Sequence, residues 1–301
     1  MPKNNKIEAS RLGIIISVIL TPIVIYLVGI CLPKLPSSKM LQDAFWANKI
    51  SSSKKYDIVF VGDSRIYRGI NPLIVSKITF SNTVNFGFSA AGLDSTLIYS
   101  ASQLLSVDGK KTMIFGITPS AFTLEASKNE HFKSLKKISK KDLWIRKHLY
   151  PELGFFNSYS LSEIKKAMNH EAYFQDCQSD GFIYSNKIPF DSTSALDAYT
   201  SYFKHTSISQ LQISKFLNII KQLQLNGIKC FAFRVPVSLP MNTLESQIFD
   251  FETFKIQLEL AGAHWMDIPQ KGFNSYDGSH LTGPSANKLS RILGDSILNY
   301  H

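Results

Sequence analysis

The apolar residues of this chain form five short runs of strand length, with helical patterns between them. Each run is nearly continuous in apolar residues, which is typical of strands that are buried on both faces of a parallel sheet. The pattern predicts an α/β fold, a three-layer α/β/α sandwich around a mainly parallel five-stranded sheet. The expected strands are 57–62, 82–88, 112–117, 229–237 and 263–268.

Helices are expected at 93–105, at 207–225 and at 283–298, with a further helix beginning at Ser160 in a Ser-x-x-Glu capping box. The alternation of strands and helices breaks between about 120 and 205, where the chain is aromatic, basic and irregular. We interpret this stretch as an insertion or lid within the α/β domain, and not as a separate domain.

A long apolar run covers 12–32 and contains no charged residue. As a helix it would be about 31 Å long, which matches the hydrocarbon core of a bilayer and exceeds the apolar region of a signal peptide. The run predicts an uncleaved transmembrane anchor, preceded by a short tail at 1–11 and followed by a juxtamembrane stalk at 33–55. The α/β domain then covers 56–301.

Basic residues slightly favour one orientation of this anchor. Lys3, Lys6 and Arg11 precede the run, whereas Lys34 and Lys39 follow it. By the positive-inside rule, the amino terminus is cytoplasmic and the main domain is periplasmic or extracellular.

The composition is typical of a globular protein, and its net charge favours anionic partners. Hydrophobic residues make up 44% of the chain, charged residues make up 19%, and the net charge is +10. Such a charge favours phosphate-bearing polymers, acidic polysaccharide or anionic lipid. A location outside the cytoplasm argues against nucleic acid as the partner.

The basic segment 131–149 carries seven Lys or Arg residues against one Asp. It is either a solvated face or a contact for anionic lipid or an acidic polymer, with Phe132, Leu135, Ile138 and Trp144 as the apolar partners.

Cysteine and histidine spacing indicates no metal site and no cofactor. Cys177 and Cys230 either pair in an oxidising compartment or remain free, with Cys230 inside an apolar strand.

Ser64 belongs to a Gly-Asp-Ser sequence at the carboxyl end of the first expected strand. In a parallel sheet, reactive residues collect at this edge. A serine hydroxyl needs a base to act as a nucleophile, and Gly-Asp-Ser by itself is typical of a turn.

His280 is the histidine whose neighbours fit the role of that base. Asp277 precedes it by three residues, in a glycine-containing turn just before the last helix. A carboxylate at this spacing can orient one imidazole nitrogen and leave the other free. Together the two motifs predict a catalytic triad of Ser64, Asp277 and His280. The backbone N–H groups of Ser64 and Gly87 are expected to form the oxyanion site.

These motifs resemble those of the SGNH (GDSL-type) hydrolase superfamily, over about residues 55–120 and 225–300. Within it, GDSR, NFGFSAAG and DGSHLTGPSA are most similar to membrane-anchored bacterial proteins that handle O-acyl groups on envelope polysaccharides. The resemblance implies the same triad, with Gly87 as the oxyanion glycine.

One signature of the superfamily is absent. An asparagine in a Gly-x-Asn-Asp turn should follow the third strand, but Gly116 and Thr118 occupy that region here. Asn85 or Asn71 is a candidate substitute. Arg65, next to the serine, is expected either to bind an anionic group of the substrate or to form a salt bridge.

The resemblance implies a serine esterase or O-acyltransferase that acts on O-acyl groups, expected to be acetyl, of an envelope or extracellular polysaccharide. Two alternatives stay open. One is a catalytically weak or inactive protein that binds or assembles polysaccharide, and the other is an anchored scaffold that recruits a multi-span acyltransferase.

Overall fold

The computed structural model describes residues 4–31, 39–154 and 172–300, and its centre is a parallel sheet of five strands. The spatial order is β2-β1-β3-β6-β7, so the chain reverses its direction of winding between β1 and β3. This confirms the predicted α/β fold with a mainly parallel five-stranded sheet flanked by helices. The strands are β1 (Ile58–Gly62), β2 (Thr83–Gly87), β3 (Thr112–Ile117), β6 (Lys229–Arg234) and β7 (His264–Trp265).

Alternate residues of each strand pack into two separate cores. In β1, Val59 and Val61 face one core, while Ile58 and Phe60 face the other. Successive side chains of a strand point to opposite faces, so a strand that is covered on both faces must be apolar throughout. This is why the strands appear in the sequence as continuous apolar runs.

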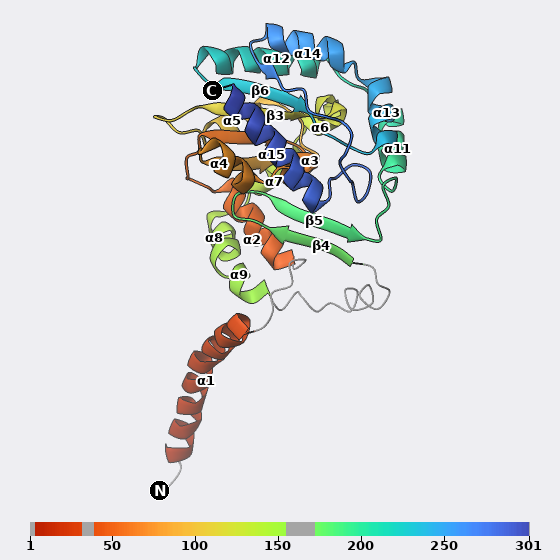
Figure 1. Cartoon of the computed structure of the whole chain (residues 1–301). Coiled ribbons are helices and arrows are strands. Elements are labelled where there is room, and N and C mark those ends of the chain that lie inside the picture. Colours follow the sequence, from red (N-terminus) through yellow and green to blue (C-terminus); the bar gives the residue numbers. More distant parts are fainter. Residues whose placement is uncertain (1–3, 32–38, 155–171, 301) are drawn as a thin grey trace.

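Two sets of helices cover the two faces of the sheet (Figure 1). One face is covered by α5 (Ser95–Ser102), α12 (Gln210–Leu225) and α14 (Phe251–Leu260). The other is covered by α3 (Ser64–Gly69), α4 (Pro72–Thr79) and α15 (Gly283–Asn299). α13 (Leu239–Ile248) follows β6.

The stretch predicted as an insertion contains short helices and a two-stranded antiparallel hairpin. The hairpin is formed by β4 (Ala172–Cys177) and β5 (Ile183–Ile188). The helix expected from Ser160 lies outside the described residues. The short helices are η1 (Pro119–Phe122), α6 (Leu124–Ser127), α7 (Glu130–Lys136), α8 (Lys140–His148), α9 (Tyr150–Leu153) and α11 (Leu196–His205).

The basic segment 131–149 forms most of α7 and all of α8. Phe132 and Leu135 are buried in the core, and Ile138 packs against it, whereas Trp144 is 55% exposed. Three of the four apolar residues that were considered as a lipid contact therefore stabilise the fold. Cys177 and Cys230 are both free thiols.

Part of the predicted stalk at 33–55 is the helix α2 (Lys39–Ile50), which packs against the domain. Ala44, Phe45 and Ala47 are buried, and the ring of Trp46 contacts those of Tyr67 and Phe88. A solvated stalk has no reason to bury aromatic residues, so α2 is an integral part of the α/β domain.

The apolar amino-terminal run lies in α1 (Asn4–Cys31). Among the residues that the structure describes, no helix combines the length and the apolar character needed to cross a membrane. The transmembrane anchor over 12–32 remains a prediction from the sequence.

β6 and β7 are shorter than predicted by three or more residues. β6 ends at Arg234, not at residue 237, and Pro236 follows two residues later with no N–H to continue the ladder. β7 is reduced to two residues at the edge of the sheet, where it pairs with β6.

Glycines let α3 pack directly on the carboxyl ends of the strands. A Cβ atom at Gly87 would lie 2.8 Å from the Tyr67 backbone nitrogen and 2.9 Å from the Asp63 carbonyl oxygen. A Cβ atom at Gly116 would overlap the side chain of Ile66. The two glycines therefore set how closely the turn at Asp63 and Ser64 approaches the sheet.

Candidate active site

Ser64 is the first residue of α3, immediately after the turn that follows β1. Asp63 fixes this turn because one carboxylate oxygen accepts a hydrogen bond from the Arg65 backbone N–H at 2.9 Å. Its other oxygen accepts one from Thr118 Oγ1 at 2.7 Å. The turn is therefore held both to the start of α3 and to the end of β3, next to the point where the sheet reverses its winding.

His280 reaches Ser64 from the loop before α15. Its Nε2 lies 2.9 Å from Ser64 Oγ, although the two residues are 216 positions apart. Its Nδ1 lies 2.7 Å from Asp277 Oδ2. The structure therefore brings the three residues of the predicted triad into one hydrogen-bonded chain.

Asp277 also holds the backbone of the histidine loop. Its Oδ1 accepts hydrogen bonds from the N–H groups of Ser279, at 2.9 Å, and His280, at 2.7 Å. The Tyr276 ring stacks on the imidazole at a centroid distance of 5.8 Å. The imidazole is thus fixed along its edge and on one face.

The pKa values of the pair suit a charged carboxylate beside a neutral imidazole. Burial alone raises the pKa of Asp277, but hydrogen bonds from the His280 ring and from the backbone outweigh it and lower the pKa to about 2. Burial lowers the pKa of His280, and the positive charge of Arg68 adds to this, against the raising effect of Asp277. An ionised Asp277 accepts from Nδ1–H, which leaves Nε2 to accept the Ser64 hydroxyl proton.

Arg65 is buried and forms a salt bridge, so it does not reach a substrate as one of its predicted roles required. Its Nη1 lies 2.6 Å from Glu245 Oε1, with both side chains 1% exposed. Its Nε donates to Ser279 Oγ at 2.9 Å. Burial opposes the charge, but Glu245 raises the pKa of Arg65 above its usual value. Arg65 thus joins the nucleophile turn to the histidine loop.

Gly87 and Asn85, which were predicted for the oxyanion site, form hydrogen bonds within the fold instead. The Gly87 N–H donates to Asn85 Oδ1 at 3.0 Å, so it is not directed at Ser64. Asn85 is fully buried, and its amide donates to the carbonyl oxygens of Ile66 and Ile70 at the end of α3. Both groups are therefore already engaged in holding α3 in this structure.

Asn71 and Thr118, the other two candidates for the oxyanion site, also form hydrogen bonds that hold the fold. Asn71 caps α4 through the Leu73 N–H and bonds the side chain of Asn287. Thr118 is fully buried and donates to Asp63. Neither contributes a free donor beside Ser64.

A cavity of roughly 570 Å³ opens beside Ser64. Residues from the loop after β2, from η1, α6 and α7, and from α11 of the insertion line it. Its lining residues are Asp63, Ser64, Ser89, Ala90, Ala91, Ser120, Glu125, Ala126, Glu130, His131, Ala198, Tyr199 and Tyr202.

Two of these lining residues lie in the loops where the oxyanion donors were expected, after β2 and after β3. Ala90 has a φ of 48°, a left-handed conformation that is costly for a residue with a Cβ atom and frequent at functional sites. Ser120 presents its hydroxyl in the region after β3 where the asparagine was expected, 3.3 Å from Thr118 Oγ1. The run of small residues in FSAAG was the available signal in the sequence, but the conformation of Ala90 was not readable from it.

We predict that Glu245→Gln destabilises the fold by about 3 kcal/mol or more, because Arg65 is left as a buried charge without its partner. Urea unfolding measures this loss. The matched control is Glu252→Gln on the exposed side of α14, which should change the free energy of unfolding by about 0.5 kcal/mol or less. Equal stability of the two variants would contradict the role assigned to the pair.

Comparisons with known proteins find only distant structural similarities. No family model matches the chain, and no curated protein matches it. A protein from Streptococcus pneumonia, provisionally named a platelet activating factor, is 14% identical with a TM-score of 0.40, over 87% of this chain and 92% of that one. A family two carbohydrate esterase from Clostridium thermocellum, in complex with cellohexaose, is 11% identical with a TM-score of 0.38, over 82% and 64%.

A carbohydrate esterase family 2 enzyme from Corynascus thermopiles is 10% identical with a TM-score of 0.39, over 82% of this chain and 66% of that one. The chain thus spans about two thirds of the length of the two esterases. Likenesses as distant as these carry no argument about activity. The interpretation of the site rests on the geometry of Ser64, His280 and Asp277.

Proposed function

We propose that this protein is a serine esterase that removes or transfers small O-acyl groups, acetyl above all, on a polysaccharide. The observation that carries the proposal is the hydrogen-bonded chain from Ser64 through His280 to Asp277. A serine, a neutral imidazole and a carboxylate in this order form the general arrangement for nucleophilic acyl transfer. The resemblance of the motifs to SGNH hydrolases supports the same reaction.

In the first half-reaction, Ser64 Oγ attacks the ester carbonyl while His280 Nε2 takes the hydroxyl proton. The tetrahedral intermediate then expels the sugar oxygen, which receives that proton from His280. The acyl group is left as an ester on Ser64. Asp277 stays ionised throughout and stabilises the imidazolium that forms at each step.

In the second half-reaction, water or a sugar hydroxyl attacks the acyl-enzyme and gives its proton to His280. The bond between the acyl group and Ser64 Oγ then breaks, and His280 returns the proton to Ser64 Oγ. Attack by water releases a carboxylic acid, and attack by a sugar hydroxyl transfers the acyl group. Both outcomes use the same residues, so the acceptor that enters the cavity decides between hydrolysis and transfer.

The oxyanion of the tetrahedral intermediate needs donors beside Ser64. We assign this role to the Ser64 N–H, which has no partner inside α3, and to the Ala90 N–H of the loop that lines the cavity. Such donors are worth roughly 3 kcal/mol each in the transition state.

The lining of the cavity supports a small acyl group on a sugar. Ser89, Ala90 and Ala91 are small residues, which fits a short acyl chain. Tyr199 and Tyr202 from the insertion line the same cavity, and a tyrosine offers an apolar face and a hydroxyl to a sugar ring. Membrane attachment through 12–32, a domain outside the cytoplasm and a multi-span acyltransferase partner stay predictions from the sequence alone.

Ser64→Ala should lower kcat/KM for acetate release from 4-nitrophenyl acetate and from acetylated xylo-oligosaccharides by about a thousandfold or more. Ser89→Ala is the matched control, because Ser89 lines the same cavity outside the triad and its variant should keep most of the activity. A protein that binds the oligosaccharide but releases no acetate would contradict the esterase and support the polysaccharide-binding alternative.

The pH dependence of kcat/KM should have an acid limb whose midpoint lies below 6.5. Only neutral His280 can accept the serine proton, and its pKa is lowered from 6.5, so activity should appear as pH rises through that lowered value. Asp277→Asn should move the limb to still lower pH, because the carboxylate raises the pKa of His280. His148→Asn, which changes an exposed histidine, is the control. A limb centred above 6.5 would contradict the assignment of His280 as the base.

A further inference from the structure

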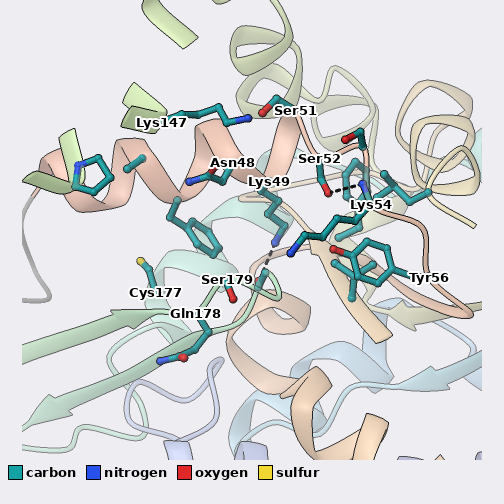
Figure 2. A pocket seen from close by; sticks show the side chains of 18 of the residues that line it. Asn48, Lys49, Ser51, Ser52, Lys54, Tyr56, Lys147, Cys177, Gln178 and Ser179 are labelled. Atoms are coloured by element: carbon teal, nitrogen blue, oxygen red, sulfur yellow. Dashed lines mark hydrogen bonds between the residues drawn. The ribbon is translucent and has the colours of Figure 1, made fainter. Parts of the chain in front are cut away.

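A second cavity, of roughly 530 Å³, lies between α2 and the turn of the β4–β5 hairpin (Figure 2). It shares no lining residue with the cavity beside Ser64. The esterase mechanism uses none of its residues.

Positive charge dominates this cavity. Lys49, Lys54 and Lys147 line it, and Asp176 is the single acidic residue among the lining residues that the structure describes. Within the described part of the chain, no carboxylate forms a salt bridge with any of the three lysines. Figure 2 labels the three lysines around the opening, and a dashed line marks the hydrogen bond of Lys49 to the turn of the hairpin.

Lys49 is the most constrained of the three, since its residue is only 7% exposed. Its ammonium donates one hydrogen bond, to the Gly181 carbonyl oxygen at 3.0 Å. The aromatic rings of α2, α3 and the segment after β2 surround it, with centroids between 5.2 and 5.5 Å from Nζ. Burial lowers the pKa of Lys49 well below its usual value, and the attraction of Asp180 only partly opposes this.

Burying a charge with one neutral acceptor is costly, and a second partner of opposite charge would offset that cost. The cavity is where such a partner has access. A bound anion would therefore interact with Lys49 in a partly desolvated setting, where charge pairs are stronger than at an open surface.

Neutral donors line the same space. Ser52, Ser53, Ser179 and Tyr56 contribute hydroxyl groups, whereas the Ser51 hydroxyl already donates to the Ala47 carbonyl oxygen at 2.7 Å. The Ser52 oxygen accepts from the Lys54 backbone N–H at 3.3 Å, so its own hydrogen is left to donate. Several hydroxyls together with two or three ammonium groups match an anion that carries many acceptor oxygens.

We propose that this cavity is a binding site for a phosphate group, either as inorganic phosphate or as a phosphate ester. Lysines bind phosphate as point charges, whereas carboxylates are typically recognised by the planar fork of arginine. No arginine is among the described residues that line this cavity. The serine hydroxyls fit the tetrahedral set of phosphate oxygens.

Calorimetric titration of the full chain in detergent with inorganic phosphate tests the proposal directly. We expect saturable binding at one site, weakened about tenfold or more in the double variant Lys54→Met with Lys147→Met, which removes two charge-assisted contacts. The matched control, Lys110→Met with Lys221→Met, removes the same charge from exposed positions that do not line the cavity and should bind as the unmodified protein does.

Lys49→Met adds a buried-site variant that keeps the aliphatic packing of the side chain. It should also weaken phosphate binding about tenfold or more while the far-ultraviolet circular dichroism is unchanged. Because the double variant alters only exposed and half-buried residues, the proposal stays testable if Lys49→Met fails to fold.

Titration with glycerol 3-phosphate distinguishes the two sources. Binding at least as tight as that of inorganic phosphate assigns a phosphate ester, and weaker binding assigns the free ion.

Absence of saturable phosphate binding, equal binding by the double variant and its control, or equal affinity for acetate would each overturn the proposal. None of these outcomes depends on esterase activity, so the two proposals fail separately.

Discussion

The buried guanidinium of Arg65 is the constraint on which the rest of the site depends. It follows Ser64 in the chain, pairs with Glu245 of α13, and donates to Ser279, the neighbour of His280. A charge that is 1% exposed must have its partners in place, so the nucleophile turn, α13 and the histidine loop can form only together. The hydrogen bond between Ser64 and His280 is a consequence of this arrangement.

The fold and the triad could be predicted from the sequence because each depends on local signals. Continuous apolar strands indicate a parallel sheet covered on both faces, and the carboxyl ends of such strands meet at one edge. Asp277 and His280 are three residues apart in a turn, so their contact is a local property. Ser64 and His280 are distant in sequence, but each stands at the end of a recognisable element.

The oxyanion site and the roles of the polar residues could not be predicted in this way. Gly87 and Asn85 carry the expected residue types, yet they hold α3 against the sheet. From the sequence, Arg65 could either bind a substrate or form a salt bridge. Its burial in the structure favours the salt bridge. Which N–H is free depends on the complete hydrogen-bond pattern, and an alanine with a positive φ such as Ala90 leaves no mark in the sequence.

The central claim is that Ser64 is a nucleophile activated by His280, and covalent labelling tests it most directly. Incubation with a fluorophosphonate, followed by digestion and mass spectrometry, should give an adduct on the peptide that contains Ser64, and Ser64→Ala should take up no label. An unlabelled native protein, or an adduct on any other serine that persists in Ser64→Ala, would contradict the account.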